Sequence, residues 1–194
     1  YIEECFAAAG ARVESQSYEA DGSVYRNIVA TYGPESGPVV VVGAHYDSCG
    51  IVPGETTTRT PGADDNASGV AGLLELARVL AKNPPTQPVE LVFYTLEEPP
   101  NFRTDDMGSY RHAKSLQNSG RAVRLMLSVE MIGYYSDAPG SQSYPLAPLG
   151  WFYPDQANFI ALIGEMARTM RYQGAGSSHI NPTQLTTLCD AMPG

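Results

Sequence analysis

Cysteines and cationic side chains are both scarce in this sequence. The three cysteines, Cys5, Cys49 and Cys189, are an odd number and show no CxxC spacing, so they indicate neither a disulfide framework nor a cysteine zinc site. Only 12 Lys and Arg residues stand against 21 Asp and Glu residues, and the formal net charge is -9. A chain this acidic lacks the basic face that nucleic-acid binding requires, and it is poorly suited to an anionic membrane surface.

Long hydrophobic runs are absent as well. The longest strongly apolar run, Val39 to Val42, is far too short to span a bilayer, and no signal peptide or targeting segment is visible. The chain begins inside an expected helix, residues 2–9, so we expect a truncation there. Secreted, periplasmic and cytoplasmic locations are therefore all open, and the sequence indicates no oligomeric state.

The sequence does contain enough apolar material for one core. Apolar residues make up 43% of the 194 residues, which predicts a single domain over residues 1–194. Strand-like and helix-like segments alternate, which predicts a three-layer α/β/α fold with a mixed, mostly parallel central sheet. An Asp21-Gly22 turn predicts an antiparallel hairpin at one edge. The expected strands are 12–18, 25–32, 38–44, 89–95 and 122–129, and the expected helices are 2–9, 68–82, 107–119, 156–172 and 183–190.

Acidic and imidazole side chains follow three of the expected strands. His45, the pair Glu97–Glu98 and Glu130 each come directly after one of them. In open α/β sheets, ligands bind outside the carboxyl ends of the strands. Adjacent acids oppose each other's ionisation, so we expect a divalent cation among them. Histidine and carboxylates without a thiolate suit zinc, or less specifically manganese or cobalt.

Each of these residues also fits an ordinary structural role. The two glutamates are compatible with a solvated turn, and Asp65 is placed to cap the helix that follows it. His45 and Asp47 are separated by one residue, so both point to one side of an extended chain. That arrangement fits a core histidine satisfied by a carboxylate, and it equally fits a carboxylate that orients a metal-bound histidine. The concentration of such groups at one rim favours the metal site.

Four motifs in order carry a resemblance to a known family. GAHYDS, PGADDNASG, FYTLEE and VEMIGY together resemble the di-zinc exopeptidase superfamily, which holds zinc aminopeptidases, related carboxypeptidases and glutaminyl cyclases. The resemblance covers roughly Ile2 to Gly133. It implies a phosphorylase/peptidase-like fold and the hydrolysis of N-terminal residues from peptides that carry a free N-terminus.

The resemblance also implies a ligand set for two zinc ions, with manganese or cobalt as alternatives. His45 and Glu130 would bind one ion, Asp65 would bridge both, and Glu98 would bind the second. Asp64 would be a neighbour and not a ligand. Glutamate stands at position 130 where the family usually has aspartate, and one extra methylene is compatible with the same ligand role.

The catalytic roles follow from the same resemblance. Glu97 would act as the general base on a metal-bridging hydroxide and would then deliver a proton to the leaving amine. Asp47 would orient His45 through the ring nitrogen that is not on the metal. Adjacent glutamates point in different directions on an extended backbone, so one can hold a metal while the other reaches the water.

The last metal ligand of the family, a late histidine, has no clear match. His179 is a substitute candidate, but the strand and helix that should follow it are missing. Our preferred hypothesis is that the chain lacks its C-terminal elements and stops just short of the final ligand, which would lie beyond Gly194. This chain alone would then hold one metal well and the second poorly, and we expect it to be impaired.

Three functions are compatible with these features. The leading one is a zinc aminopeptidase, and the alternatives are a glutaminyl-cyclase-like acyltransferase with one zinc ion and a catalytically impaired binding domain. The remaining polar and aromatic candidates are expected to be structural. His112 is expected to be a surface or packing residue, and Asp105 and Asp106 are expected to cap the helix 107–119. Tyr144, Trp151 and Tyr153 are expected to form a folded loop or to line a substrate pocket.

Overall fold

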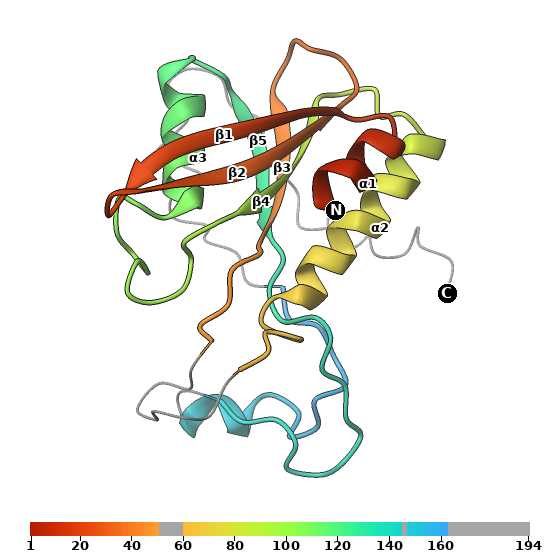
Figure 1. Ribbon diagram of the computed structural model, residues 1–194. Helices are drawn as coiled ribbons and strands as arrows, with labels where there is room; N and C mark the ends of the chain where they lie inside the picture. The colour runs from red at the N-terminus through yellow and green to blue at the C-terminus, as the bar shows by residue number, and fades with distance from the viewer. Residues whose placement is uncertain (51–59, 145–146, 163–194) are drawn as a thin grey trace, which may run out of the picture. The chain divides into compact units, whose positions relative to one another are not determined.

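A mixed five-stranded sheet lies at the centre of the fold, in the order β1-β2-β4-β3-β5 (Figure 1). The structure is a computed structural model that describes residues 1–50, 60–144 and 147–162. Within these residues β3 pairs in parallel with β4 and β5, and β2 pairs antiparallel with β1 and β4. The strands are β1 (Arg12–Ala20), β2 (Ser23–Tyr32), β3 (Val39–His45), β4 (Val89–Tyr94) and β5 (Val123–Ser128).

Only β2 therefore runs against the other described strands, which confirms the predicted mixed and mostly parallel sheet. The hairpin β1–β2 turns at Asp21 and Gly22, whose φ angles are 48° and 74°. Two central residues with positive φ are typical of the tight turn that matches the right-handed twist of paired strands. The antiparallel hairpin lies at one edge of the sheet, as expected.

Helices cover both faces of the sheet, so the three layers predicted from the sequence are present. The helices α1 (Ile2–Ala8) and α2 (Ala67–Lys82) lie on one face, and α3 (Gly108–Asn118) lies on the other (Figure 1). On the first face Phe6 and Leu73 pack with Phe93 of β4. On the second face Val92 of β4 packs with Leu116 of α3. Because helices cover both of its faces, β4 is buried at every position, which explains why its sequence is apolar except at Glu90.

The segment after β5 differs from the prediction. Residues 156–162 are not helical, because their backbone groups are engaged elsewhere. The carbonyl of Ala157 accepts the amide of Ser136 at 2.9 Å, and the amide of Ala157 donates to Oγ of Ser141 at 3.0 Å. A short 3-10 helix, η1 (Ala147–Trp151), lies in the stretch predicted to be irregular. The rest of the expected helix 156–172, the expected helix 183–190, His179 and Cys189 lie outside the described residues.

Residues 1–158 form one compact unit, and the site described below lies within it. Among the described helices, none combines the length and the apolar character that crossing a membrane requires.

Candidate metal centre

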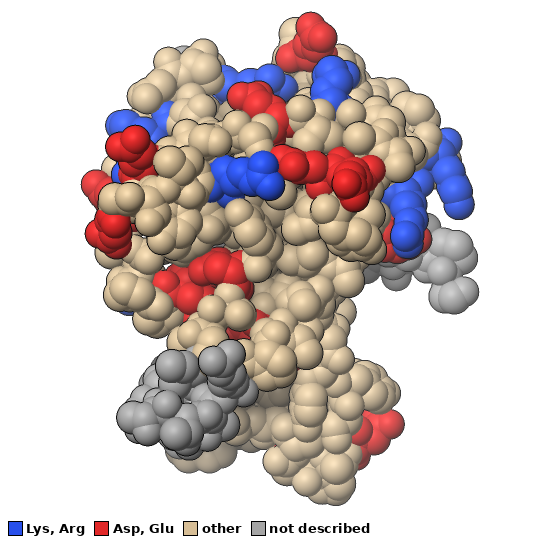
Figure 2. Space-filling view, viewed as in Figure 1, with Lys and Arg blue, Asp and Glu red and all other residues tan. Residues whose placement is uncertain are grey.

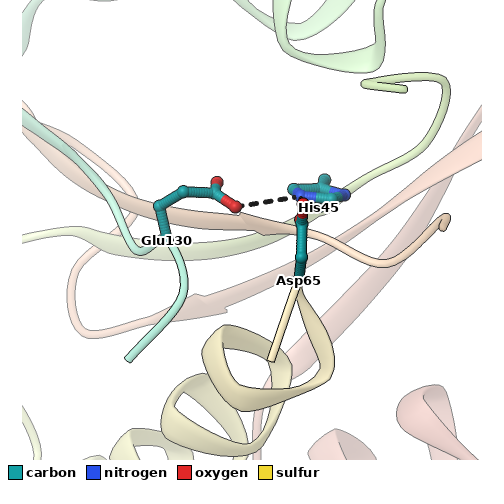
Figure 3. A group of neighbouring side chains, drawn as sticks. All are labelled: His45, Asp65 and Glu130. Carbon is teal, nitrogen blue, oxygen red and sulfur yellow. Dashed lines mark hydrogen bonds and ion pairs between the residues drawn. The ribbon is translucent and has the colours of Figure 1, made fainter. Parts of the chain in front are cut away.

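A buried histidine at the end of β3 is the centre of the site. Only 3% of His45 is exposed, and its Nε2 atom lies 3.0 Å from Oδ1 of Asp65 and 3.1 Å from Oε1 of Glu130. Figure 3 shows Asp65 rising from the start of α2 and Glu130 reaching across from the segment after β5. One potential ligand atom from each of the three residues lies within 4.8 Å of the others. The structure therefore brings these three predicted ligands together.

Parallel strand pairing explains this convergence. His45 is paired with Tyr94 of β4, so the chain that leaves β4 starts beside the histidine. The amide of Val129 donates to the carbonyl of Gly43 at 2.8 Å, which continues the pairing of β5 with β3 up to the residue before Glu130. The carboxyl ends of neighbouring parallel strands meet at one edge of the sheet, as the sequence pattern predicted.

Asp65 does not cap α2. The N-cap residue is Asn66, whose Oδ1 accepts the amide of Gly69 at 3.1 Å, so the interpretation of Asp65 as a helix cap is wrong. Because its neighbour caps the helix, the carboxylate of Asp65 faces His45 instead. Sequence reasoning missed Asn66, although an Asn directly before an apolar helix is an N-cap signal.

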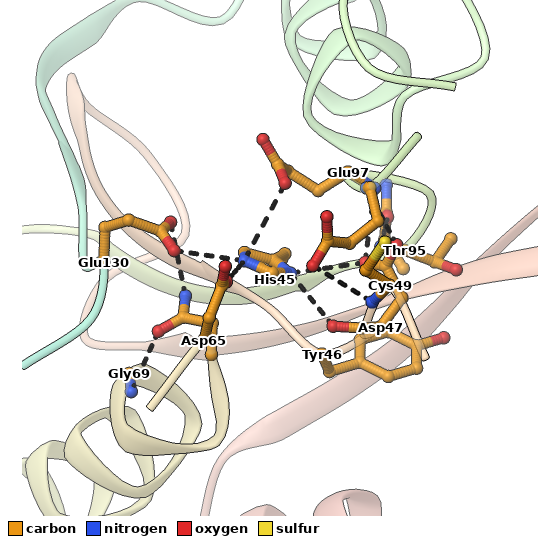
Figure 4. A network of polar contacts seen from close by, with 12 residues as sticks. His45, Tyr46, Asp47, Cys49, Asp65, Gly69, Thr95, Glu97 and Glu130 are labelled. Atoms are coloured by element: carbon orange, nitrogen blue, oxygen red, sulfur yellow. Dashed lines mark hydrogen bonds and ion pairs between the residues drawn. The ribbon is translucent and has the colours of Figure 1, made fainter. Parts of the chain in front are cut away.

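Asp47 joins the histidine to the turn after β4 (Figure 4). Its backbone carbonyl oxygen lies 3.1 Å from Nδ1 of His45, and its carboxylate lies 3.5 Å from the same nitrogen. The carboxylate also accepts two backbone amides, that of Glu97 through Oδ1 at 3.2 Å and that of Glu98 through Oδ2 at 3.0 Å. The sequence suggested one task for Asp47, orienting the histidine. The structure adds a second, which is to hold the backbone of the glutamate pair.

The two adjacent glutamates have different partners. Oε2 of Glu97 lies 3.8 Å from Nε2 of His45, whereas Oε1 of Glu98 accepts the amide of Cys49 at 3.1 Å. Glu98 is therefore outside the three-residue group, but it lines a cavity of about 390 Å³ together with Asp65. Glu97 is thus close to His45, while Glu98 and Asp65 line the same cavity.

The close packing of charges shifts the pKa values of the site. Burial lowers the pKa of His45, but hydrogen bonds with Asp47 and Glu130 outweigh burial and raise the pKa to about 11. Burial raises the pKa of Glu97, and neighbouring carboxylates raise it further against the opposing charge of His45. Burial also acts to raise the pKa of Asp47, but the hydrogen bond with His45 and two backbone amides lower it overall. Positive charge is therefore strongly favoured at Nε2 of His45.

The donor atoms present at this centre fit a zinc ion. In the described part of the chain, the carboxylates of Asp65, Glu97 and Glu130 form ion pairs with His45 and with no Lys or Arg. Figure 2 shows acidic side chains gathered on the viewed face near the ends of β3 and β4. Several carboxylates around one imidazole leave an excess of negative charge that a divalent cation neutralises. Imidazole nitrogen and carboxylate oxygen are ligands that zinc takes in proteins.

Two groups of charged residues outside this centre have structural partners. Nε2 of His112 lies 3.2 Å from Oε2 of the buried Glu90, which fits the expected packing role. Asp106 does not cap α3, because the N-cap residue is Met107 and it forms no side-chain cap hydrogen bond. Asp106 instead forms an ion pair with Arg111, so the predicted capping is wrong.

Asp64 and the late aromatic residues also have partners. Asp64 accepts the amide of Gly133 at 2.7 Å, which makes it a neighbour that holds the loop after Glu130. The ring of Tyr144 lies 5.9 Å from that of Tyr153, as expected for a folded loop. Trp151 is 79% exposed, and a role of these aromatic rings in a substrate pocket stays a prediction.

Curated proteins are similar to this chain over part of their length. YfbL, an uncharacterized protein of Escherichia coli strain K12, is 55% identical over 166 residues, which are 86% of this chain and 50% of that protein. Leucine aminopeptidase 1 of Ajellomyces capsulatus is 34% identical over 134 residues, which are 66% of this chain and 32% of that protein. The chain thus spans half of the first relative and about a third of the second.

Solved structures share the fold. A zinc-dependent exopeptidase from Parabacteroides distasonis is 29% identical with a TM-score of 0.57, over 72% of this chain and 53% of that one. A glutaminyl cyclase from Porphyromonas gingivalis is 26% identical with a TM-score of 0.60, over 71% of this chain and 52% of that one. The sequence profile of peptidase family M28 matches residues 27–174, a range that holds all four motifs. This match confirms the suspected superfamily, and the chain belongs to peptidase family M28.

Proposed function

We propose that the protein is a zinc-dependent aminopeptidase that removes N-terminal residues from peptides. The observation that carries this proposal is the convergence of Asp65 and Glu130 on Nε2 of the buried His45. These three residues hold one zinc ion. The leucine aminopeptidase of Ajellomyces capsulatus and the zinc-dependent exopeptidase of Parabacteroides distasonis support this assignment.

A second ion is assigned to Asp65 and Glu98, with manganese and cobalt as alternatives to zinc at both positions. Both carboxylates line the cavity of about 390 Å³, and the charge of Asp65 contributes to the raised pKa of Glu98 after burial. A carboxylate whose pKa is raised by a neighbouring carboxylate is a place where a cation is favoured. Asp65 would then be a ligand of both ions, as the motif resemblance implies.

Zinc, when bound, polarises the scissile carbonyl and lowers the pKa of water. Glu97 supplies the proton transfers. It accepts a proton from the attacking water, and it returns a proton to the amine that leaves when the peptide C–N bond breaks. The raised pKa of Glu97 suits this task, because a general base works best with a pKa near the operating pH. Asp47 holds the Glu97 amide at 3.2 Å, which keeps this base beside the centre.

The excess of carboxylates suits a substrate with a free α-ammonium group. Glu97, which the proposal leaves off the metals, has a pKa raised by burial and by neighbouring acids, and a cationic N-terminus relieves that repulsion. A blocked N-terminus lacks this charge. The acidic surroundings therefore favour an exopeptidase that acts at a free amino end.

Zinc analysis combined with two substrates tests the proposal. We expect the full-length protein to contain zinc by elemental analysis and to hydrolyse aminoacyl-p-nitroanilides, but not their Nα-acetylated counterparts. A chelator should abolish the hydrolysis, and added zinc should restore it. A protein that takes up no zinc, or that cleaves both substrates equally, would contradict the proposal.

A glutaminyl-cyclase-like acyltransferase with one zinc ion is the second candidate, favoured by the likeness to the Porphyromonas gingivalis cyclase at a TM-score of 0.60. The two candidates differ in products and in metal count. Two zinc ions and release of an N-terminal residue support the aminopeptidase. One zinc ion and release of ammonia from peptides that begin with glutamine support the cyclase. Zinc binding without turnover of either substrate supports an impaired binding domain.

A further inference from the structure

We propose that Asn66 is a positioning residue that couples two carboxylate ligands, Asp65 and Glu130, and selects the oxygen that Glu130 presents to zinc. This inference rests on the proposed function, because it assumes that both carboxylates hold zinc. It goes beyond helix capping, since it gives the side-chain amide of Asn66 a task at the metal centre.

The first step is the number of hydrogen bonds that Asn66 makes. The residue is 1% exposed, and its Oδ1 accepts the amide of Gly69 at 3.1 Å and that of Met131 at 3.3 Å. Its Nδ2 donates to the carbonyl of Val129 at 2.8 Å and to Oε2 of Glu130 at 3.4 Å. A cap needs only the Oδ1 acceptor. The other three bonds tie the start of α2 to the segment after β5.

The second step is that the two carboxylate oxygens of Glu130 have different partners. Oε2 is the oxygen that faces Asn66, and Oε1 lies 3.1 Å from Nε2 of His45. The side chain of Glu130 is 43% exposed, so without a hydrogen-bond partner it can adopt several rotamers. Fixing a long side chain has an entropic cost. The hydrogen bond from Asn66 reduces this freedom before zinc binds.

The third step is the fit of the surrounding backbone. A Cβ atom at Gly69 would lie 2.4 Å from Oδ1 of Asn66 and 2.8 Å from the carbonyl oxygen of Val129. Glycine at this position therefore allows the close approach of α2 and the strand end that Asn66 bridges. Because Asn66 directly follows Asp65, one buried amide fixes the placement of a ligand on each side.

The decisive experiment compares Asn66→Ser with the unchanged protein. Serine is about as good an N-cap as asparagine, but it is too short to reach Glu130. We expect zinc affinity, measured by competition with a chelator, to fall about 10- to 100-fold, as is typical when a partner that orients a metal ligand is lost. Asn83→Ser is the matched control, because Asn83 is the C-cap residue of the same helix and donates to Val79 in an exposed position. We expect it to leave zinc affinity unchanged.

A double-mutant cycle separates positioning from general loss of structure. If Asn66 acts through Glu130, adding Asn66→Ser to Glu130→Ala should cause little further loss of zinc affinity, because coupled residues are not additive. Fully additive losses, or an Asn66→Ser protein that binds zinc as tightly as the unchanged protein, would overturn the inference. Circular dichroism of the metal-free variants checks their folding. If Asn66→Ser fails to fold, Asn66→Thr provides the same test, because threonine is also an N-cap residue and is also too short to donate to Glu130.

The outcomes also separate this inference from the proposed function. An unchanged protein that takes up no zinc would overturn both proposals. Zinc uptake and peptidase activity in the unchanged protein, together with normal zinc affinity in Asn66→Ser, would overturn only the role of Asn66.

Discussion

Oε1 of Glu130 lies 3.1 Å from Nε2 of His45, although the two residues are 85 positions apart in the sequence. The contact depends on the pairing of β5 with β3, whose last paired residues, Gly43 and Ser128, lie two positions before His45 and Glu130. A site assembled in this way depends on the fold as a whole. Its parts can nevertheless be tested one at a time, because each side chain faces a different partner.

Replacing His45 by glutamine should remove the first zinc ion. His45 is the one nitrogen ligand in the described three-residue group, and an amide is a much weaker zinc ligand than imidazole. We expect zinc content to fall by about one ion per chain, with loss of peptidase activity, as measured by elemental analysis. His112→Gln is the control, because His112 pairs with Glu90 away from the centre. It should lower stability and leave zinc content unchanged.

Replacing Glu97 by glutamine should separate catalysis from metal binding. The Oε2 atom of Glu97 lies 3.8 Å from Nε2 of His45, and glutamine keeps the shape of the side chain without its basicity. We expect kcat to fall by about 10²- to 10⁴-fold, with zinc content preserved. Steady-state kinetics on an aminoacyl-p-nitroanilide provides the measurement, and Glu75→Gln on the exposed side of α2 is the control. An unchanged kcat would show that Glu97 is not the base.

Replacing Asp47 by asparagine should weaken both the metal site and the base. The carboxylate accepts amides of Glu97 and Glu98 with its two oxygens, and asparagine offers one acceptor where two are needed. We expect zinc affinity to fall about 10- to 100-fold, together with a lower kcat. Asp21→Asn, in the β1–β2 turn, is a suitable control, because asparagine tolerates positive φ. A variant that loses activity but binds zinc normally would limit Asp47 to holding the glutamates.

Stability at alkaline pH should depend on Tyr18, which holds the loop that follows Glu97 and Glu98. The hydroxyl of Tyr18 donates to the carbonyl of Asp106 at 2.9 Å, and burial raises its pKa from 10.0 to about 12. Folded and unfolded Tyr18 are both neutral below pH 10, so its contribution to stability is complete there. Between about pH 10 and 12 the unfolded chain loses the proton first, and that stability is lost as pH rises.

Thermal unfolding at several pH values measures this effect. We expect Tyr18→Phe to flatten the loss of stability between about pH 10 and 12, since phenylalanine has no proton to lose. Tyr1→Phe is the control, because Tyr1 is 83% exposed. Equal pH profiles for the Tyr18→Phe variant and the unchanged protein would contradict the assignment.

Much of the fold follows directly from the sequence pattern. The run of valines at 39–42 predicts a strand buried on both faces, and Asp21-Gly22 predicts the hairpin; the structure confirms both. The placement of His45 and Glu130 at one rim follows as well, because parallel strands end on the same side. Whether these side chains carry out the proposed chemistry stays a prediction.

The details that failed are those set by contacts between distant segments. The apolar spacing after Gln156 resembles a helix, but the backbone of Ala157 bonds to Ser136 instead, a pairing that local spacing cannot reveal. The capping of α2 by Asn66 and not by Asp65 depends on which side chain faces the strand end. The contact of Glu98 with the amide of Cys49 also depends on the path of the chain after β3, and the proposed metal role of Glu98 stays a prediction.

Asp47 contacts both His45 and the backbone of Glu97 and Glu98, which limits how the site can be altered. The carboxylate of Asp47 holds the backbone amides of the two glutamates, and the same residue contacts His45, so Asp47 links the proposed base to a proposed metal ligand. Engineering that seeks a new spacing between them cannot tune one side without disturbing the other. The wall of the neighbouring cavity at Pro61 belongs to a separate stretch of the chain and can be changed without replacing Asp47.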